Sequence, residues 1–91
     1  MSSQAIANPE ELERFARELK QFNAQLADSM SRLQGQFANL ADTWRDQEHS
    51  KFAQEFEQTM RVLHHFRNSA DQQIPFLLRK AARIRDYLQQ H

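Results

Sequence analysis

Large apolar residues recur at intervals of three and four along the first half of the chain. Leucine occupies every seventh position from Leu12 to Leu40, and phenylalanine or methionine fills most of the row beside it. This spacing is typical of a helix packed along one face, because about 3.6 residues complete each turn. Asn8 is a favoured N-cap, and Pro9 suits the first helical position. The pattern therefore predicts a helix over about residues 9–41.

The same apolar spacing resumes after a polar interval at residues 42–46. Asp46 is a favoured N-cap for a second helix, and Phe56 opens a row that again repeats every seven residues. Pro75 lies within this pattern, where it cannot donate the backbone hydrogen bond of a regular helix. Because the apolar phase continues across Pro75, the spacing predicts one helix over about residues 47–89 that is kinked at the proline.

Two long helices joined by a few residues must fold back on each other as an antiparallel hairpin. Composition supports an all-α fold, since the chain has one glycine and two prolines and is rich in good helix formers. We predict a single domain over residues 1–91. The glycine, Gly35, is either a tolerated weak point of the first helix or a site of close approach. The hairpin would bring an acidic helix start near a basic helix end, formed by Glu10, Glu11 and Glu13 and by Arg79, Lys80, Arg83 and Arg85.

The apolar stripe is too wide for a lone hairpin to bury. It is two rows wide on both helices, and the chain holds seven phenylalanines. One neighbouring helix covers a single side of such a stripe, so the rest would remain a large exposed apolar patch. Pairing two hairpins into a dimeric four-helix bundle would cover it, as a homodimer or as a heterodimer with a homologous hairpin. The predicted bundle and dimer interface comprises Leu12, Phe15, Leu19, Phe22, Leu26, Leu33, Phe37, Leu40, Phe52, Phe56, Met60, Leu63, Phe66, Ile74, Leu77 and Ile84.

The balance of charges limits the classes of molecule that the chain is expected to bind. Twelve basic and twelve acidic residues cancel, whereas a surface for nucleic acid or an anionic membrane requires an excess of positive charge. We therefore expect protein partners and no nucleic acid. No apolar run reaches the roughly 20 residues of a membrane span, so we expect no membrane insertion. Residues 1–7 lack the basic-then-apolar layout of a signal peptide, so export would need another route.

The chain carries no recognisable catalytic or metal-binding pattern. It has no cysteine, and the adjacent His64 and His65 would point about 100° apart on a helix. His49, near the start of the second helix, is more typical of a packing or turn-stabilising residue than of a metal ligand. No serine sits in a nucleophile elbow, and no glycine-rich phosphate loop is present. We predict a non-enzymatic protein with no cofactor and no metal site.

Trp44, the only tryptophan, lies in the predicted turn. It could close the end of the bundle as a hydrophobic plug, or it could anchor a partner, since tryptophan is enriched at binding hot spots. The two roles are compatible if the plug packs against the dimer mate. Asp46 follows two residues later as the predicted cap of the second helix. We therefore predict Trp44 and Asp46 as the turn motif and partner anchor.

A chain near 100 residues, with two long helices and a Trp-X-small turn between them, resembles the WXG family of early-secreted-antigen-like proteins. The likeness covers nearly the whole chain and rests on Trp44-Arg45-Asp46, followed by Phe52 and Phe56. The resemblance implies a helical hairpin that pairs into a homo- or heterodimeric four-helix bundle. It also implies a substrate, partner or chaperone of a type VII secretion system, with a secretion ATPase or a toxin as a further partner.

Two departures from the family pattern bear on this implied role. Asp46 stands where the motif has glycine, and it would suit a turn of positive φ less well. The export signal of the family is a tyrosine followed four residues later by an acidic residue, whereas Tyr87 is followed there by His91. Either a partner supplies the signal and the chain is secreted without a cleaved signal peptide, or the protein stays in the cytoplasm.

Two other functions fit a short helical hairpin. One is a cytoplasmic helical adaptor or chaperone without export, which the absent acidic residue favours. The other is a type III needle-like structural subunit. Turns of needle subunits typically carry prolines, and the turn predicted here has none.

Overall fold

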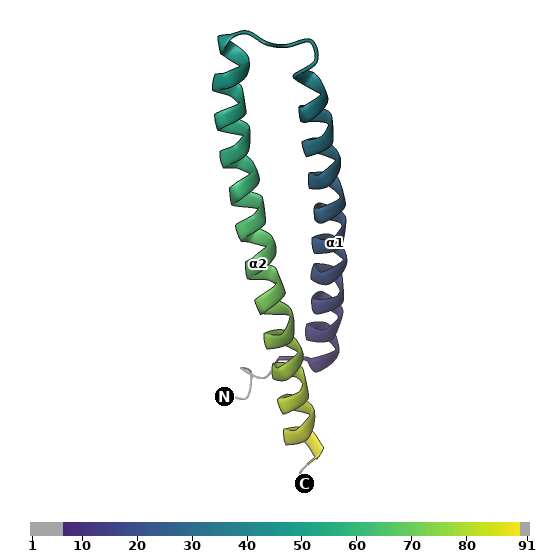
Figure 1. Ribbon diagram of the computed structural model, residues 1–91. Coiled ribbons are helices and arrows are strands. Elements are labelled where there is room, and N and C mark those ends of the chain that lie inside the picture. Colours follow the sequence, from purple (N-terminus) through teal and green to yellow (C-terminus); the bar gives the residue numbers. More distant parts are fainter. Residues whose placement is uncertain (1–6, 90–91) are drawn as a thin grey trace.

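The computed structural model describes residues 7–89 and forms two long helices from them. Helix α1 spans Pro9–Leu40, and helix α2 spans Gln47–Gln89. The helices lie side by side in opposite directions, and a turn over residues 41–46 joins them at one end of a long rod (Figure 1). The rod measures 70 × 22 × 15 Å. The predicted all-α antiparallel hairpin is confirmed, and its helix bounds agree with the structure to within one residue.

Both helices begin at the caps that the sequence predicts. The Asn8 side chain accepts backbone hydrogen bonds from Glu10 at 2.8 Å and Glu11 at 3.4 Å. The Asp46 side chain accepts one from the backbone N–H of His49 at 3.1 Å. Each cap satisfies backbone donors that have no partner within the helix, so the starts of both helices are defined by local chemistry.

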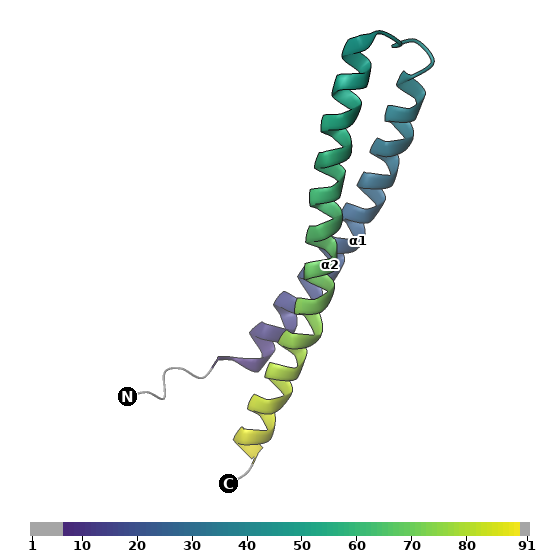
Figure 2. The same cartoon turned by 60° about the vertical axis from the view of Figure 1, so that its left-hand side comes forward.

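Two residues that could interrupt the helices leave them intact. Pro75 lies inside α2, which continues as one helix from Gln47 to Gln89. Figures 1 and 2 show α2 as a gently curved ribbon. Gly35 lies inside α1, and a Cβ added there would meet no atom within 4 Å. Within the hairpin, Gly35 is therefore not a site of close approach, and it is the tolerated weak point of the two alternatives.

The size of the contacting side chains varies along the rod. Alanine fills the contact over much of its length, where Ala16, Ala70 and Ala81 are at most 1% exposed. Toward the turn, phenylalanine rings take over, and the centroid of the Phe37 ring lies 4.8 Å from that of Phe56 and 5.7 Å from that of Phe52. Figure 1 shows the two ribbons separating toward the turn, which is the end where the larger side chains lie between them.

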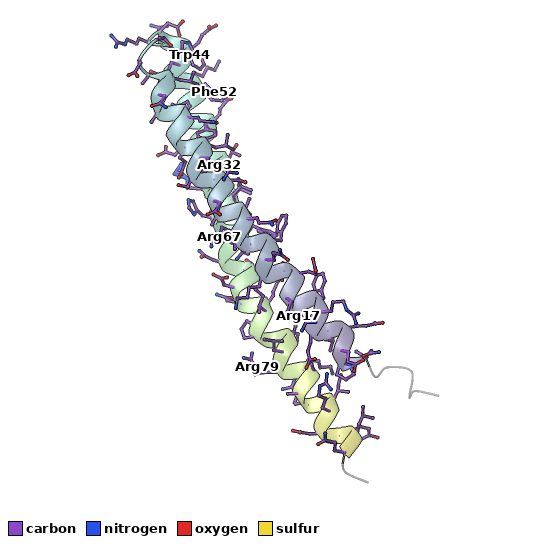
Figure 3. The ribbon with its side chains drawn as sticks, turned by 90° about the vertical axis from the view of Figure 1, so that its right-hand side faces the viewer. Arg17, Arg32, Trp44, Phe52, Arg67 and Arg79 are labelled. Atoms are coloured by element: carbon purple, nitrogen blue, oxygen red, sulfur yellow. The ribbon has the colours of Figure 1, made fainter. Side chains whose placement is uncertain are left out.

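A polar residue, Asn23, is buried in the middle of this contact at 3% exposure. Its side-chain amide donates hydrogen bonds to the Arg67 carbonyl at 3.1 Å and to the Asp71 carboxylate at 2.9 Å. The Arg67 Nε donates in return to the Asn23 carbonyl at 3.3 Å, and Figure 3 shows Arg67 near the middle of the rod. These bonds form only when the two helices are in one register, so Asn23 ties α1 to α2 at a single level.

The predicted approach of the acidic helix start to the basic helix end is confirmed by one ion pair. The Arg85 guanidinium donates two hydrogen bonds to the Glu13 carboxylate, at 2.7 and 3.2 Å. The hydrogen bond and charge of Arg85 lower the pKa of Glu13 below its ordinary value of 4.5, and Glu13 raises the pKa of Arg85. Both side chains remain open to water, so the pair contributes more to register than to stability.

Candidate functional site

The exposed phenylalanine rows of the two helices lie on the same side of the hairpin. The Phe22 and Phe66 rings meet edge to face across the helices, with centroids 5.9 Å apart and an interplanar angle of 82°. The contact nevertheless leaves Phe22 52% and Phe66 41% exposed. Phe15 lies seven residues before Phe22, and Phe52 lies fourteen before Phe66, so each shares the helix side of its counterpart.

A shallow apolar groove continues this side toward the turn. It encloses about 350 Å³, and Leu33, Gln36, Phe37, Leu40, Phe52 and Phe56 line it. Leu33 and Leu40 therefore open onto the same side as Phe52. We use the name front face for the exposed apolar residues of this side, which are Phe15, Phe22, Leu33, Leu40, Phe52 and Phe66.

The structure divides the predicted interface into three layers. Met60 and Ile84 are buried within the hairpin. A second layer of half-buried residues lines the contact between the helices. The third layer is the front face, whose residues are 41–58% exposed. The half-buried residues are Leu12, Leu19, Leu26, Phe37, Phe56, Leu63, Ile74 and Leu77.

Two large exposed apolar residues of α2 were not predicted from the sequence, and they lie beyond Phe66 at the edge of the front face. Val62 is 59% exposed and Phe76 is 55% exposed. They lie fourteen residues apart on α2, on the side of Phe66 that is turned away from α1. They fall outside the two rows of the stripe, and their spacing of two heptads is the signal that could have identified them.

The polar contacts between the two helices lie on the opposite side of the hairpin. Glu13 lies two residues before Phe15, which turns it about 160° away around α1. The Glu13–Arg85 pair and the Asn23–Asp71 hydrogen bond join the helices on that side. The exposed phenylalanine rows and the hydrogen-bonded contacts between the helices therefore lie on opposite sides of the hairpin.

The turn residues form a connected cluster at the end of the rod. The Trp44 indole donates a hydrogen bond of 2.9 Å to the Asp46 carboxylate, through the same oxygen that caps α2. The His49 ring stacks on Phe37 at 5.4 Å and meets the Trp44 ring edge-on at 5.1 Å. His49 thus acts in packing, as predicted. Figure 3 shows Trp44 and Phe52 together at this end of the molecule.

Trp44 packs within its own hairpin in this arrangement. It is half-buried, its backbone N–H donates to the Leu40 carbonyl at 2.8 Å, and its ring lies 5.8 Å from the Phe52 ring. Phe52 belongs to the front face, so Trp44 supports that face from the turn. The plug role predicted for Trp44 fits these contacts, and its role as a partner anchor remains a prediction.

Asp46 needs no special backbone conformation at this position. No residue in the described range has a positive φ. The expected discomfort of aspartate in place of glycine is therefore wrong for this turn. A carboxylate here performs two tasks, because one oxygen receives both the indole N–H and the capping N–H.

Replacing Asp46 with alanine is expected to lower the free energy of unfolding by about 0.5–2 kcal/mol, because the cap and the indole lose their shared acceptor. Urea unfolding at fixed chain concentration measures this. Asp46→Asn keeps a side-chain oxygen and should cost less, and Asp42→Ala in the same turn is the control. Equal losses for Asp42→Ala and Asp46→Ala would contradict the assigned role.

No group of three His, Cys, Asp or Glu residues within residues 7–89 is arranged to hold a metal ion. In the same range, neither helix is long and apolar enough to cross a membrane. The distinctive features of residues 7–89 are the front face and the turn cluster.

The family model of WXG100, described as "Proteins of 100 residues with WXG", matches residues 4–89. The chain belongs to the WXG100 family. Trp44 supplies the tryptophan of the motif, and Asp46 occupies the place of its glycine. The family resemblance predicted from sequence is thereby confirmed, and WXG100 proteins form homo- or heterodimers.

A solved structure of a WXG100 protein has the same fold. It is a crystal structure of a mutant of EsxB, a secreted protein of Bacillus anthracis strain Sterne. The two chains share 25% sequence identity over 93% of each, with a TM-score of 0.75. No curated protein matches the chain significantly.

Proposed function

We propose that the chain pairs through its front face into a dimeric four-helix bundle and serves a type VII-like secretion system as substrate, partner or chaperone. The front face carries this proposal. Its six large apolar side chains are 41–58% exposed and lie on one side of the hairpin. Burial of apolar surface is favourable by about 25 cal/mol per Å², and a second hairpin supplies the cover. Membership of a family of dimer-forming proteins supports this pairing.

Export is the second part of the proposal. The similar EsxB is a secreted protein. Tyr87 is 59% exposed near the end of α2, but His91 stands where the family signal has an acidic residue. His91 lies outside the described residues. A further partner exported together with the chain, such as a toxin, would then supply the acidic residue that the signal lacks in this chain.

The pairing is tested by light scattering at micromolar concentration. The wild type is expected to show about twice the chain mass of 10.8 kDa. Phe22→Asp places a charge in the centre of the front face and should give a monomer, because an unpaired buried charge is costly. Leu78→Asp is the matched control, since Leu78 is 44% exposed and lies about 160° around α2 from Phe76. A wild type that stays a monomer both alone and after a homologous hairpin is added would overturn the pairing.

Export is tested by fractionating cultures with and without the ATPase of the candidate secretion system. The protein is expected in the medium only when the ATPase is intact. Retention in the cell under both conditions would favour the second candidate function, a cytoplasmic adaptor or chaperone. The specific observation in favour of that candidate is the histidine in place of the acidic residue of the signal.

A further inference from the structure

One side of the second half of α2 carries an aromatic ring surrounded by cations. Phe76, Arg79, Lys80 and Arg83 follow one another at positions i, i+3, i+4 and i+7, so their side chains leave the same side of the helix. All four residues are exposed, and the Phe76 side chain reaches 55% exposure. We use the name basic patch for these four residues.

The basic patch lies beside the front face and points outward from the hairpin. Phe76 comes ten residues after Phe66, which turns it about 80° around α2 and further from α1. Leu78 lies about 160° around α2 from Phe76, so it marks the other side of the same helix. A partner centred on Phe66 and Phe22 therefore leaves the ring of Phe76 directed toward solvent.

The cations of the basic patch have no carboxylate to pair with in the hairpin. Among the described residues, none of its three cations forms an ion pair. In residues 58–85 the one acidic residue is Asp71, which lies about 140° around α2 from Phe76 and accepts a hydrogen bond from Asn23. Asp86 follows only at the end of the patch. The patch is therefore a local excess of positive charge on a chain whose charges cancel overall.

The apolar part of this side continues toward the turn. Val62 is 59% exposed and lies two heptads before Phe76, with the smaller Ser69 midway between them. At 1.5 Å per residue, Val62 and Phe76 are about 21 Å apart along the helix. Two large residues separated by a small one leave room for a side chain of a facing helix. The side therefore fits a helix of about three heptads that packs along α2.

The charges define what kind of helix fits. Cations around one ring are complemented by carboxylates that flank an apolar seam, whereas a basic helix would be repelled. Nucleic acid or an anionic membrane requires a broader field of cations, or a broad apolar face that enters the lipid. The residues that precede Phe76 on its side are instead polar, namely His65, Ser69, Gln72 and Gln73.

We propose that the basic patch docks an acidic amphipathic helix of a protein other than this chain. The apolar seam of that helix covers Val62 and Phe76, and its carboxylates meet the three cations. A second copy of the chain fits less well, because the acidic start of its α1 carries Arg14 and Arg17 among the glutamates. The inference goes beyond the proposed function, since it assigns α2 a surface that is separate from the front face.

A synthetic helix of about three heptads serves as the probe for the full-length chain. It carries leucine at the a and d positions, glutamate at the flanking e and g positions, and a fluorophore, and its twin has lysine in place of each glutamate. Fluorescence anisotropy measures binding. The acidic peptide is expected to bind at least about tenfold more tightly than the lysine twin, with an affinity that falls as salt is added. Equal binding of the two peptides would overturn the proposal.

The ring of the basic patch is tested by Phe76→Asp, which should weaken binding of the acidic peptide at least about tenfold, because it removes the apolar anchor and adds a repelling charge. Leu78→Asp places the same charge on the other side of α2 and should stay within about threefold of the wild type. Light scattering should show that Phe76→Asp leaves the self-pairing unchanged. Loss of self-pairing in Phe76→Asp would overturn the separation of the patch from the front face.

The cations are tested by the double variant Lys80→Glu/Arg83→Glu, which should also weaken binding at least about tenfold. Arg14→Glu/Arg17→Glu changes the net charge equally on α1, and it should stay within about threefold of the wild type. Equal losses in the two double variants would overturn the patch as the site.

Vesicles of equal parts phosphatidylglycerol and phosphatidylcholine test the other anionic occupant. No binding to them is expected at concentrations that saturate the acidic peptide. Vesicle binding that Phe76→Asp abolishes, without peptide binding, would overturn the helix in favour of a membrane. A wild type that binds the acidic peptide as a monomer would overturn the front-face pairing and leave this inference standing.

Discussion

Met60→Ala is expected to lower the free energy of unfolding by about 2–5 kcal/mol, the largest loss that a single truncation should cause in this hairpin. Met60 is 4% exposed and borders the same groove as Phe37 and Phe56, two of the phenylalanines that lie between the helices near the turn. Its removal would leave a cavity that neighbouring rings cannot fill, because they already pack against one another. A domain of this size is stable by only about 5–15 kcal/mol, so the loss should be large on that scale.

Urea unfolding at one fixed chain concentration measures this loss, since pairing makes stability depend on concentration. Leu78→Ala is the control, because the side chain removed is 44% exposed and lies off the front face. It should cost less than about 1 kcal/mol. A similar loss for both variants would show that Met60 does not occupy the core of the hairpin.

Ala81→Leu is expected to destabilise the hairpin by about 1–3 kcal/mol through overpacking. Ala81 is fully buried at 0% exposure, where α2 meets the first part of α1, and a larger side chain there would push the helices apart. The expected change in melting temperature is a fall of roughly 4–8 °C per kcal/mol. Thermal unfolding followed by circular dichroism measures it.

The neighbouring residue provides a matched control for this substitution. Ala82 is exposed, so Ala82→Leu adds the same atoms to the same helix without a packing conflict. Helix propensity barely distinguishes the two residues, and the change should lie within about 0.5 kcal/mol. An equal loss for Ala82→Leu would point to an effect on the unfolded chain or on pairing rather than to the helix contact.

Much of the fold follows from local sequence signals. The seven-residue rows predicted two helices, and Asn8, Pro9 and Asp46 predicted where they begin. These predictions agree with the structure because capping and apolar periodicity act over one or two turns of helix. A kink was expected at Pro75. The helix α2 is continuous through this residue and gently curved along its length.

The candidate site could be predicted only in part. Trp44 and Asp46 stood out because of their position between the helices, but their shared hydrogen bond and the packing of His49 depend on contacts made after folding. Asn23 was overlooked because a polar residue does not contribute to an apolar pattern. Its spacing of seven residues from Ala16 and from Met30 places it in the helix contact.

The sequence by itself determined two antiparallel helices, an apolar stripe too wide for one neighbour, and the turn motif of the WXG100 family. Only the tertiary structure decided which part of the stripe is buried inside the hairpin and which part forms the front face. The physical reason is rotation about the helix axis. Periodicity defines the width of an apolar stripe, but Ala16, Asn23 and Ala81 set how far each helix turns, since small and hydrogen-bonded residues determine where the two backbones approach.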